Sequence, residues 1–344
     1  MADQIKCGVV GATGYAGFEL ARLLRKHPNV SASVLFRRGE HSAATLDEAY
    51  PQIMNGQPTP LHAFSWEQVE KEKVDLLFLA TPHETSWELV PEGLRRGLKV
   101  IDLSGAWRLK DEANRKIYKL VESAVSVATL KQSVYGSPEL HGATIRGSKL
   151  VANPGCYATS VILALAPFAK NDLIDRHADI VCDCKSGVSG AGKQLSPKTH
   201  FVEVAENLSA YSVFGHRHTG EILEQLGISA ERLIFTPHLL PIPRGILSTI
   251  YVRLKEATAA ATVEETLRKF YAGSTSVRIF PHPLLPQIQH SLRTNYCDIG
   301  FALGPDGKKL ILVSCLDNLI KGAAGQAVQN MNVMYGWAEQ EGLN

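Results

Sequence analysis

A run of closely spaced glycines near the N-terminus limits the fold of this chain more than any other feature. Residues 11–17 read Gly-Ala-Thr-Gly-Tyr-Ala-Gly, between a short apolar run at 5–10 and apolar residues at helical spacing over 18–25. Glycine allows the tight turn that a strand needs when it passes directly into a helix. A further strand-like segment at 30–36 completes a strand–helix–strand unit, which predicts a parallel sheet covered by helices.

The same alternation continues through the first half of the chain. Apolar runs at 74–80 and 99–103 are typical of buried strands, and residues 86–96 are typical of the helix between them. After residue 156 the strand-like runs are separated by longer loops rich in Gly, Pro and His. We therefore predict an α/β chain, in which a Rossmann-type parallel-sheet domain is followed by an α+β domain.

The second half is expected to hold a mixed or antiparallel sheet. Strands are predicted at 180–185 and 246–255 and in a hairpin across the turn Gly-Pro-Asp-Gly, and helices at 263–271 and 318–335. The hairpin would join 298–303 to 310–315. Residues 237–245 hold three prolines, which predicts a stiff loop.

Composition narrows the class of protein. A chain of 344 residues with 45% hydrophobic and 20% charged residues is long and apolar enough for two globular domains. The net charge is only +2 and no basic block occurs, so we expect neither nucleic acid nor a membrane as partner. Six cysteines in a chain of this length do not suggest a disulfide scaffold, and the N-terminus lacks a signal-peptide pattern. A cytoplasmic protein with reduced thiols is expected.

Cys156 is the strongest candidate for covalent chemistry. It follows Asn153-Pro154-Gly155 and the apolar run 150–152, and it precedes a helix-forming segment at 160–166. That order puts one thiol at a strand-to-helix junction, where free N–H groups and the helix dipole favour a thiolate. A thiolate is a nucleophile for acyl carbons. The alternative is a small buried residue at a tight Pro-Gly turn.

The other cysteines lack this placement. Cys182 and Cys184 alternate along a predicted strand and therefore face the same side. A metal pair is conceivable there, but no further cluster supplies the remaining ligands of a closed zinc site. We expect buried thiols and no metal site.

Two histidines two residues apart are the candidates for acid–base work. His216 and His218 flank Arg217, and either imidazole is suited to take a thiol proton and return it to a developing alkoxide. The residues alone leave open which histidine is the base, or whether the segment is a plain polar loop. Arg217 is suited to hold an anionic group of a substrate.

The glycine loop predicts a bound dinucleotide, with its pyrophosphate on the helix N-terminus, and the alternative is a plain glycine-rich turn. The following strand ends in Arg37-Arg38 where NAD enzymes carry an acidic residue, which favours the 2′-phosphate of NADP unless both arginines are merely solvated. Ser186 and Gly187 open a second small-residue loop, whose backbone is suited to approach phosphate or nicotinamide unless the loop is only a flexible turn. Arg108 follows the strand at 99–103, at the edge where open α/β sheets bind ligands.

Together these segments resemble the N-acetyl-gamma-glutamyl-phosphate reductase family over essentially the whole chain. The motifs that carry the resemblance lie at 8–17, 152–157, 215–218 and 317–330, and the last is shared with the wider semialdehyde dehydrogenases. The resemblance implies a Rossmann domain at 1–152 and a substrate domain of the glyceraldehyde-3-phosphate dehydrogenase type at 153–317. It also implies a C-terminal helix at 318–344 that returns to the first domain, and a homo-oligomer of two or four subunits.

The resemblance implies NADPH-dependent reduction of N-acetyl-L-glutamyl 5-phosphate, an acyl phosphate, through a cysteine thioester in arginine biosynthesis. Cys156 would be the nucleophile and His218 the acid–base group, with His216 nearer the substrate. Substrate contacts are expected from Arg108, Asn153 and Arg217. Cofactor contacts are expected from Gly11, Thr13, Gly14, Tyr15, Ala16, Gly17, Arg37, Arg38, Ser186, Gly187 and Asn318.

Three alternatives stay open at this point. The same chemistry would serve a carrier-bound aminoadipyl phosphate of lysine synthesis, or aspartyl phosphate. A non-catalytic NADP-binding protein would keep the fold without turnover. One departure from the family pattern is Gly220, where proline is more usual, so the histidine loop is less stiff here.

Overall fold

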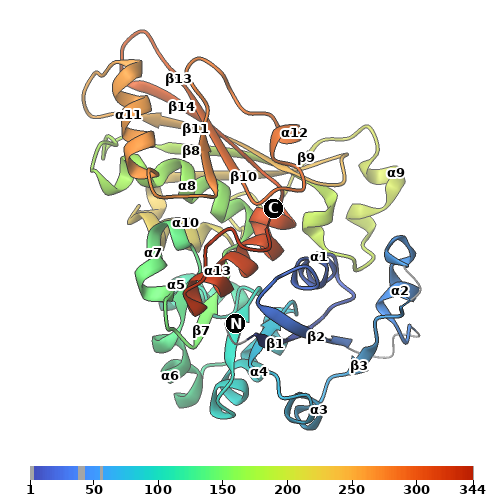
Figure 1. Cartoon of the computed structure of the whole chain (residues 1–344). Coiled ribbons are helices and arrows are strands. Elements are labelled where there is room, and N and C mark those ends of the chain that lie inside the picture. The colour runs from blue at the N-terminus through green and yellow to red at the C-terminus, as the bar shows by residue number, and fades with distance from the viewer. Residues whose placement is uncertain (1–3, 38–42, 55–56, 344) are drawn as a thin grey trace. The chain divides into compact units, whose positions relative to one another are not determined.

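The chain forms two compact units in a computed structural model that describes residues 4–37, 43–54 and 57–343 (Figure 1). Unit 1 is built from Met1–Lys110, Tyr118–Asn153 and Ala323–Asn344. Unit 2 is built from Asp111–Ile117 and Pro154–Gly322. Each unit holds one seven-stranded sheet among the described residues.

The sheet of unit 1 is parallel throughout, in the order β3-β2-β1-β4-β5-β7-β6. Its strands are β1 (Ile5–Val10), β2 (Val30–Arg37), β3 (Leu61–Ala63), β4 (Leu76–Leu79), β5 (Lys99–Asp102), β6 (Val134–Tyr135) and β7 (Leu150–Ala152). The four strands predicted from apolar runs in the first half, β1, β2, β4 and β5, are confirmed. β3 and β6 were missed because two or three residues are too short to show a period.

Both faces of this sheet are buried, which explains why its strands read as continuous apolar runs. Cys7 and Val9 pack into one core cluster and Val10 into the other, as alternation along a strand requires. The covering helices are α1 (Tyr15–Leu24), α2 (Leu46–Ala49), α3 (Trp66–Lys71), α4 (His83–Arg95), α6 (Ala124–Gln132), α7 (Pro138–Ile145) and α13 (Gly325–Tyr335).

The C-terminal segment joins unit 1. Ala327, Val328 and Met331 of α13 are fully buried in the same core cluster as Cys7 and Val9. The continuous helix predicted over 318–335 is wrong at its start, since a π-helical turn (Ile320–Ala324) precedes α13. Asp317 caps this start, because its carboxylate accepts the backbone N–H groups of Leu319 and Ile320, which have no partner within a helix at that position.

The sheet of unit 2 is mixed, in the order β12-β13-β14-β11-β8-β10-β9. Its strands are β8 (Ile180–Gly187), β9 (Ser209–Ala210), β10 (Leu233–Leu240), β11 (Ile246–Arg253), β12 (Val277–Ile279), β13 (Cys297–Leu303) and β14 (Lys309–Leu316). The predicted hairpin is confirmed as the antiparallel pair β13 and β14. The loop expected over 237–245 is wrong for its first four residues, which continue β10 in parallel register with β8 despite Pro237.

One long helix, α8 (Cys156–Lys170), packs against the centre of this sheet. All residues from Tyr157 to Phe168 are buried, because the helix is apolar around its whole circumference. The remaining helices of unit 2 are α5 (Glu112–Arg115), α9 (Phe201–Val204), α10 (Thr219–Leu226), α11 (Ala260–Phe270) and α12 (Ile288–Ser291). The segment Asp111–Ile117 joins this unit through Glu224, whose Oε1 accepts from Asp111 N and Asn114 Nδ2 at 3.1 and 3.0 Å.

Candidate active site

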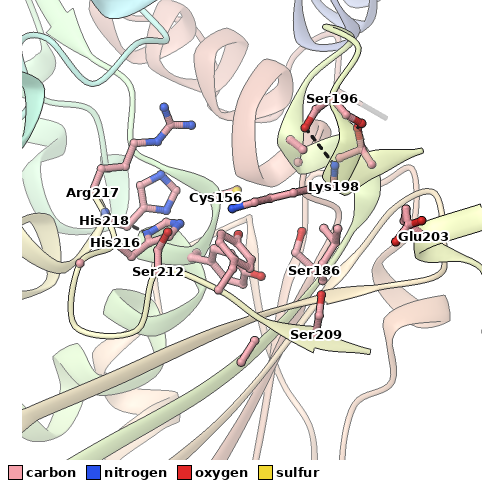
Figure 2. Close-up of a pocket in the computed structure, with 18 of the residues that line it drawn as sticks. Cys156, Ser186, Ser196, Lys198, Glu203, Ser209, Ser212, His216, Arg217 and His218 are labelled. Atoms are coloured by element: carbon pink, nitrogen blue, oxygen red, sulfur yellow. Dashed lines mark hydrogen bonds between the residues drawn. The ribbon is translucent and has the colours of Figure 1, made fainter. Parts of the chain in front are cut away.

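Cys156 is the first residue of α8, and Gly155 is the N-cap. Its thiol forms no disulfide and is partly exposed, and it lines a cavity of about 630 Å³ within unit 2 (Figure 2). The first N–H groups of a helix have no partners within the helix, and the helix dipole is positive there. The predicted junction is therefore present, and it favours the thiolate form of Cys156.

The two histidines lie together beside this thiol, immediately before α10. Their ring centroids are 4.7 Å apart, and both side chains are buried. A methyl group added at Gly155 would lie 2.3 Å from Nε2 of His218, so this ring rests on the residue directly before the nucleophile. Gly155 leaves the space that His218 needs to approach the start of α8.

His216 is held neutral. Burial and the neighbouring charge of Arg217 lower the pKa of His216 to about 4. The backbone N–H of His218 donates to Nδ1 of His216 at 3.2 Å, which leaves the ring hydrogen on Nε2. The His216 ring also packs against Tyr157, Tyr211 and Phe235, with centroid distances of 5.3 to 5.7 Å.

A buried carboxylate, missed from the sequence, links the two helix starts. Glu221 lies in the first turn of α10 and is fully buried, and its Oε2 accepts the backbone N–H of Gly155 at 3.0 Å. The bond fixes the approach of the histidine segment to the N-terminus of α8. The signal in the sequence was the three-residue spacing from His218, which puts both side chains at the same end of one helix.

Several polar side chains from distant parts of unit 2 complete the cavity wall. Ser186 comes from the end of β8, Arg217 from the histidine loop, and Lys198 and Glu203 from the segment between β8 and β9. Ser186 and Arg217 were predicted site residues, and both line the cavity with Cys156 and the two histidines. Lys198 and Glu203 were not anticipated.

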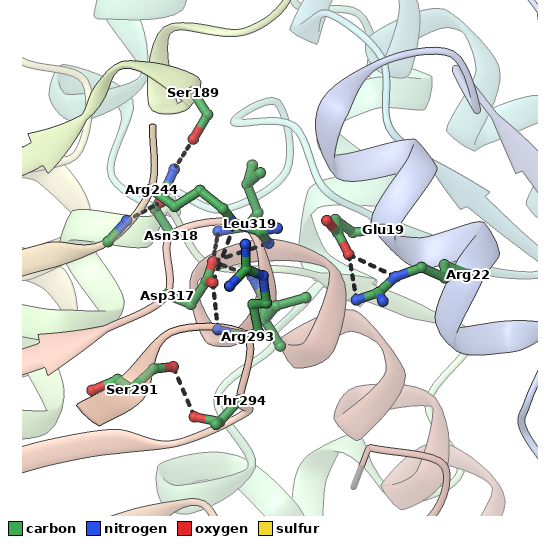
Figure 3. Close-up of polar contacts among 12 residues, drawn as sticks. Glu19, Arg22, Ser189, Arg244, Ser291, Arg293, Thr294, Asp317, Asn318 and Leu319 are labelled. Carbon is green, nitrogen blue, oxygen red and sulfur yellow. Dashed lines mark hydrogen bonds and ion pairs between the residues drawn. The ribbon is translucent and has the colours of Figure 1, made fainter. Parts of the chain in front are cut away.

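Gly187 and Asn318 join loops of unit 2. A methyl group on Gly187 would lie 2.6 Å from the backbone nitrogen of Arg244, so only glycine fits that approach. Asn318 accepts from Gly245 N at 2.7 Å and donates to Ser189 Oγ at 2.9 Å (Figure 3). The loops that begin at Ser186 and end at Gly245 are thereby held together; the cofactor role of these residues stays a prediction.

Asp317, next to Asn318, is fully buried, and its carboxylate accepts hydrogen bonds from several groups. Its carboxylate pairs with the Arg244 guanidinium at 3.2 Å and accepts from the backbone N–H groups of Arg293 and Leu319, both at 2.8 Å (Figure 3). A buried carboxylate needs such compensation. This cluster fixes the segment that holds Asn318.

In unit 1, the glycine loop has the geometry that a dinucleotide needs. Gly11 has a φ of +85°, and a methyl group there would lie 2.3 Å from the carbonyl oxygen of Ala80. A methyl group on Gly17 would lie 2.2 Å from the oxygen of Gly11. Gly14 is the N-cap of α1, which begins at Tyr15, and glycine has no side chain that could bond the first N–H groups of this helix. Those groups are therefore left for an anion such as a pyrophosphate.

The structure also describes Thr13, Arg37 and Arg108 of unit 1, which were predicted to contact cofactor or substrate. The carbonyl of Thr13 accepts from the Tyr50 hydroxyl at 3.0 Å, and Arg37 ends β2, whereas Arg38 lies outside the described residues. Arg108 is buried, and its guanidinium donates to the carbonyls of Asn153 and Leu103 at 2.7 and 2.8 Å.

Asn153 is buried as well. It donates to the carbonyl of Ala323 at 3.1 Å and accepts from Asn330 at 2.9 Å. These bonds use many of the hydrogen-bond donors and acceptors of the Arg108 and Asn153 side chains. Their substrate roles stay predictions.

Cys182 and Cys184 are both fully buried on β8, as expected, and burial raises the pKa of each thiol. No group of three His, Cys, Asp or Glu side chains that would hold a metal occurs in the part of the chain that the structure describes. In the same residues, no helix is long and apolar enough to cross a membrane.

Two family models match the chain on either side of the thiol. Residues 6–148 match "Semialdehyde dehydrogenase, NAD binding domain", and residues 156–318 match "Semialdehyde dehydrogenase, dimerisation domain". The chain therefore has a nicotinamide-dinucleotide-binding domain and a domain of a type that mediates dimerisation.

Full-length relatives agree with these matches. Proteins named N-acetyl-gamma-glutamyl-phosphate reductase from Pelotomaculum thermopropionicum and Halothermothrix orenii are 43% and 42% identical to this chain. The alignments cover 98% and 99% of this chain and 97% and 98% of those proteins. A protein of the same name from Campylobacter jejuni is 42% identical over 99% of this chain and 98% of its own length.

Solved structures confirm the predicted fold class. Aspartate semialdehyde dehydrogenase II from Vibrio cholerae, complexed with ASA, has a TM-score of 0.72 at 18% identity, over 96% of this chain and 98% of that chain. Aspartate semialdehyde dehydrogenase with NADP from Candida albicans has a TM-score of 0.70 at 17% identity, with the same coverage. At such identities the likeness concerns the fold alone.

Proposed function

Because the chain belongs to the N-acetyl-gamma-glutamyl-phosphate reductase family of semialdehyde dehydrogenases, we propose that it is an NADPH-dependent oxidoreductase of arginine biosynthesis. It reduces N-acetyl-L-glutamyl 5-phosphate to N-acetyl-L-glutamate 5-semialdehyde and releases phosphate. The observation that supports this most strongly is the single cavity wall shared by Cys156, His216 and His218. A thiol at a helix start beside two imidazoles is suited to acyl transfer.

In the proposed reaction Cys156 attacks the acyl carbon, the bond from that carbon to the phosphate oxygen breaks, and a thioester remains on the sulfur. The nicotinamide, when bound, would supply the hydride that reduces this acyl group. The backbone N–H of Cys156 is a candidate to stabilise the oxyanion, because the first N–H groups of α8 lack helical partners. The thiolate leaves as the aldehyde forms.

His218 is proposed to be the acid–base group, which takes the proton of the Cys156 thiol and returns it to the developing alkoxide. Its ring lies against Gly155, one residue before the nucleophile, and Glu221 holds that approach through the Gly155 N–H. His216, neutral at physiological pH, is proposed to orient His218 and to face the substrate. The two histidines thus divide proton transfer and positioning between them.

For the cofactor, the backbone of residues 11–17 is proposed to receive the pyrophosphate at the start of α1. The close approaches at Gly11 and Gly17 support this, since no larger residue fits. Arg37 and Arg38 are proposed to favour NADP over NAD through the 2′-phosphate. Ser186, Gly187 and Asn318 are proposed on the nicotinamide side, and Arg108, Asn153 and Arg217 with the substrate.

We propose that residues 1–152 form the domain that binds the cofactor and residues 153–317 the domain that binds the substrate. Residues 318–344 are proposed to form a helix that returns to the first domain.

We further propose a cytoplasmic homodimer or homotetramer. The sheet face of unit 2 that is not covered by α8 supports self-association: Leu247, Thr249 and Tyr251 of β11 alternate with fully buried neighbours and remain partly or largely exposed. Apolar, half-exposed sheet faces are typical of subunit interfaces.

The reverse reaction tests the substrate. The protein is mixed with NADP, phosphate and N-acetylglutamate semialdehyde, and NADPH formation is followed by absorbance, with aspartate semialdehyde in a parallel sample. We expect phosphate-dependent NADPH formation with the acetylated substrate alone. Activity only with aspartate semialdehyde would retain the thioester chemistry and reject the proposed substrate. Activity with neither would reject both small semialdehydes as substrates.

A further inference from the structure

A lysine missed by the sequence analysis points into the cavity that contains Cys156. Lys198 belongs to a 3₁₀ turn, Pro197–Thr199, which Ser196 fixes at both ends. Ser196 Oγ accepts the backbone N–H of Lys198 at 3.3 Å, and its carbonyl accepts the Thr199 hydroxyl at 3.2 Å. Figure 2 shows the Lys198 side chain extending from this turn into the cavity, with its amino group on the side of Cys156.

No acidic side chain among residues 4–37, 43–54 and 57–343 neutralises this ammonium group. Across the described residues, the Lys198 ammonium makes no ion pair and no hydrogen bond to another side chain, and only its backbone N–H is bonded, although Glu203 lines the same cavity. Lys198 is an exposed residue, and its positive charge on the cavity wall attracts anions, because charges of one sign along a cavity raise the local concentration of ions of the opposite sign. The cavity has a second cation, Arg217, which Figure 2 shows beyond the two histidines.

Resting on the proposed function, we propose that Lys198 binds the phosphate end of the acyl phosphate. The phosphate is bonded to the carbon that the Cys156 sulfur attacks, so its oxygens must lie beside the thiol during the reaction. The α-carboxylate is separated from that carbon by the rest of the glutamyl chain. The cation directed toward Cys156 therefore meets the phosphate, and Arg217 is left for the carboxylate.

The assignment gives Lys198 a role in the transition state as well as in binding. As the carbon–sulfur bond forms and the carbon–oxygen bond breaks, the electron pair of that bond passes to the departing phosphate oxygen. A fixed positive charge next to that oxygen stabilises the added negative charge. In reverse, a phosphate oxygen attacks the thioester carbon and the Cys156 thiolate leaves, so Lys198 would hold the attacking phosphate.

The reverse reaction separates the two anionic groups, because phosphate and the semialdehyde are then different substrates. For Lys198→Met we expect the KM for phosphate to rise about tenfold to a hundredfold, the range for losing one hydrogen bond between charged groups. The KM for the semialdehyde should change by less than about twofold. Lys198→Arg should restore most of the phosphate affinity. Lys170→Met, at the far end of α8, is the control for a lost surface charge.

Phosphate protection gives a readout that does not need turnover. Phosphate is expected to slow alkylation of Cys156 by iodoacetamide in the wild type and in Lys170→Met, at ionic strength matched with chloride, and to protect Lys198→Met much less. Equal protection of the wild type and Lys198→Met would overturn the proposal. So would a raised KM for the semialdehyde with an unchanged KM for phosphate, since Lys198 would then serve the carboxylate. Absence of turnover alongside phosphate protection would reject the proposed function and leave the phosphate subsite standing.

Discussion

The glycine loop of unit 1 and the thiol cavity of unit 2 are built in different ways. The loop is formed by seven consecutive residues, and its shape depends on missing side chains at Gly11 and Gly17. The cavity joins Cys156 to side chains that lie 30 to 62 residues away in sequence, from Ser186 to His218. A site made of backbone is expected to be disrupted by a small increase in side-chain volume. A site made of side chains is expected to be disrupted by the exchange of one functional group for another.

The largest expected effect tests the chemistry of the cavity. Cys156→Ser should lower turnover by at least about a thousandfold, because a hydroxyl is a far poorer nucleophile and leaving group than a thiolate. NADPH affinity, measured by fluorescence titration, should stay within about twofold of the wild type, since that site depends on backbone. Cys297→Ser, at a buried thiol 3.3 Å from Ser314 Oγ, is the matched control and should remain active. Loss of both turnover and NADPH binding in Cys156→Ser would contradict the view that the glycine loop binds the cofactor independently of the thiol cavity.

The next effect separates the two histidines. His218→Asn should lower kcat by about a hundredfold, the usual contribution of a general acid or base. His216→Asn should lower it less, by about tenfold, because this neutral ring is proposed to position rather than to carry the proton. The kcat values of both variants, from steady-state kinetics, distinguish the two roles. A larger loss of kcat in His216→Asn than in His218→Asn would make His216 the proton carrier and His218 the positioning residue.

Gly17→Ala tests the backbone site. The added methyl would lie 2.2 Å from the carbonyl oxygen of Gly11, which must shift and move the loop. We expect unfolding to become easier by about 1–3 kcal/mol and NADPH to bind more weakly. The alkylation rate of Cys156 should not change. Gly142→Ala, in α7 with open space at its methyl position, is the control and should be neutral or stabilising.

A further effect is a pH dependence of stability from His216. The pKa of this imidazole falls from 6.5 to about 4 on folding, so the unfolded chain binds the extra proton first as pH falls. The stability that the neutral ring contributes is complete above pH 6.5 and is lost between about pH 6.5 and pH 4, by up to about 3 kcal/mol. Urea unfolding of the wild type and His216→Asn across this range measures it. Parallel pH curves for the two proteins would refute the assignment.

The same contrast explains what the sequence could predict. Strand β1, the glycine loop and α1 follow from local patterns, because each depends on neighbouring residues. The place of Cys156 at a helix start was also a local matter, set by Pro154 and Gly155. β10 was missed, and its second half was predicted as a loop, because Pro237 is a strong local breaker, whereas the pairing of this strand with β8 comes from distant residues.

The residues missed in the site are missed for a tertiary reason. Glu221 is one acidic residue in a helix until the fold brings it to the N–H of Gly155, 66 residues earlier in the chain. Lys198 lies in an exposed segment with no regular period, and only the turn at Pro197 directs it into the cavity. Local spacing puts Glu221 at the same helix end as His218, but it does not reveal the contact with Gly155 or the direction of the Lys198 side chain.

A single-turnover measurement tests the thioester at Cys156 most directly. The protein is mixed with NADP and N-acetylglutamate semialdehyde without phosphate, NADPH is followed by stopped-flow absorbance, and the acid-quenched protein is analysed by peptide mass spectrometry. We predict a burst of about one NADPH per subunit and an N-acetylglutamyl adduct on the peptide that holds Cys156, because no phosphate is present to release the acyl group. The absence of a burst, or an adduct on another residue, would contradict the account.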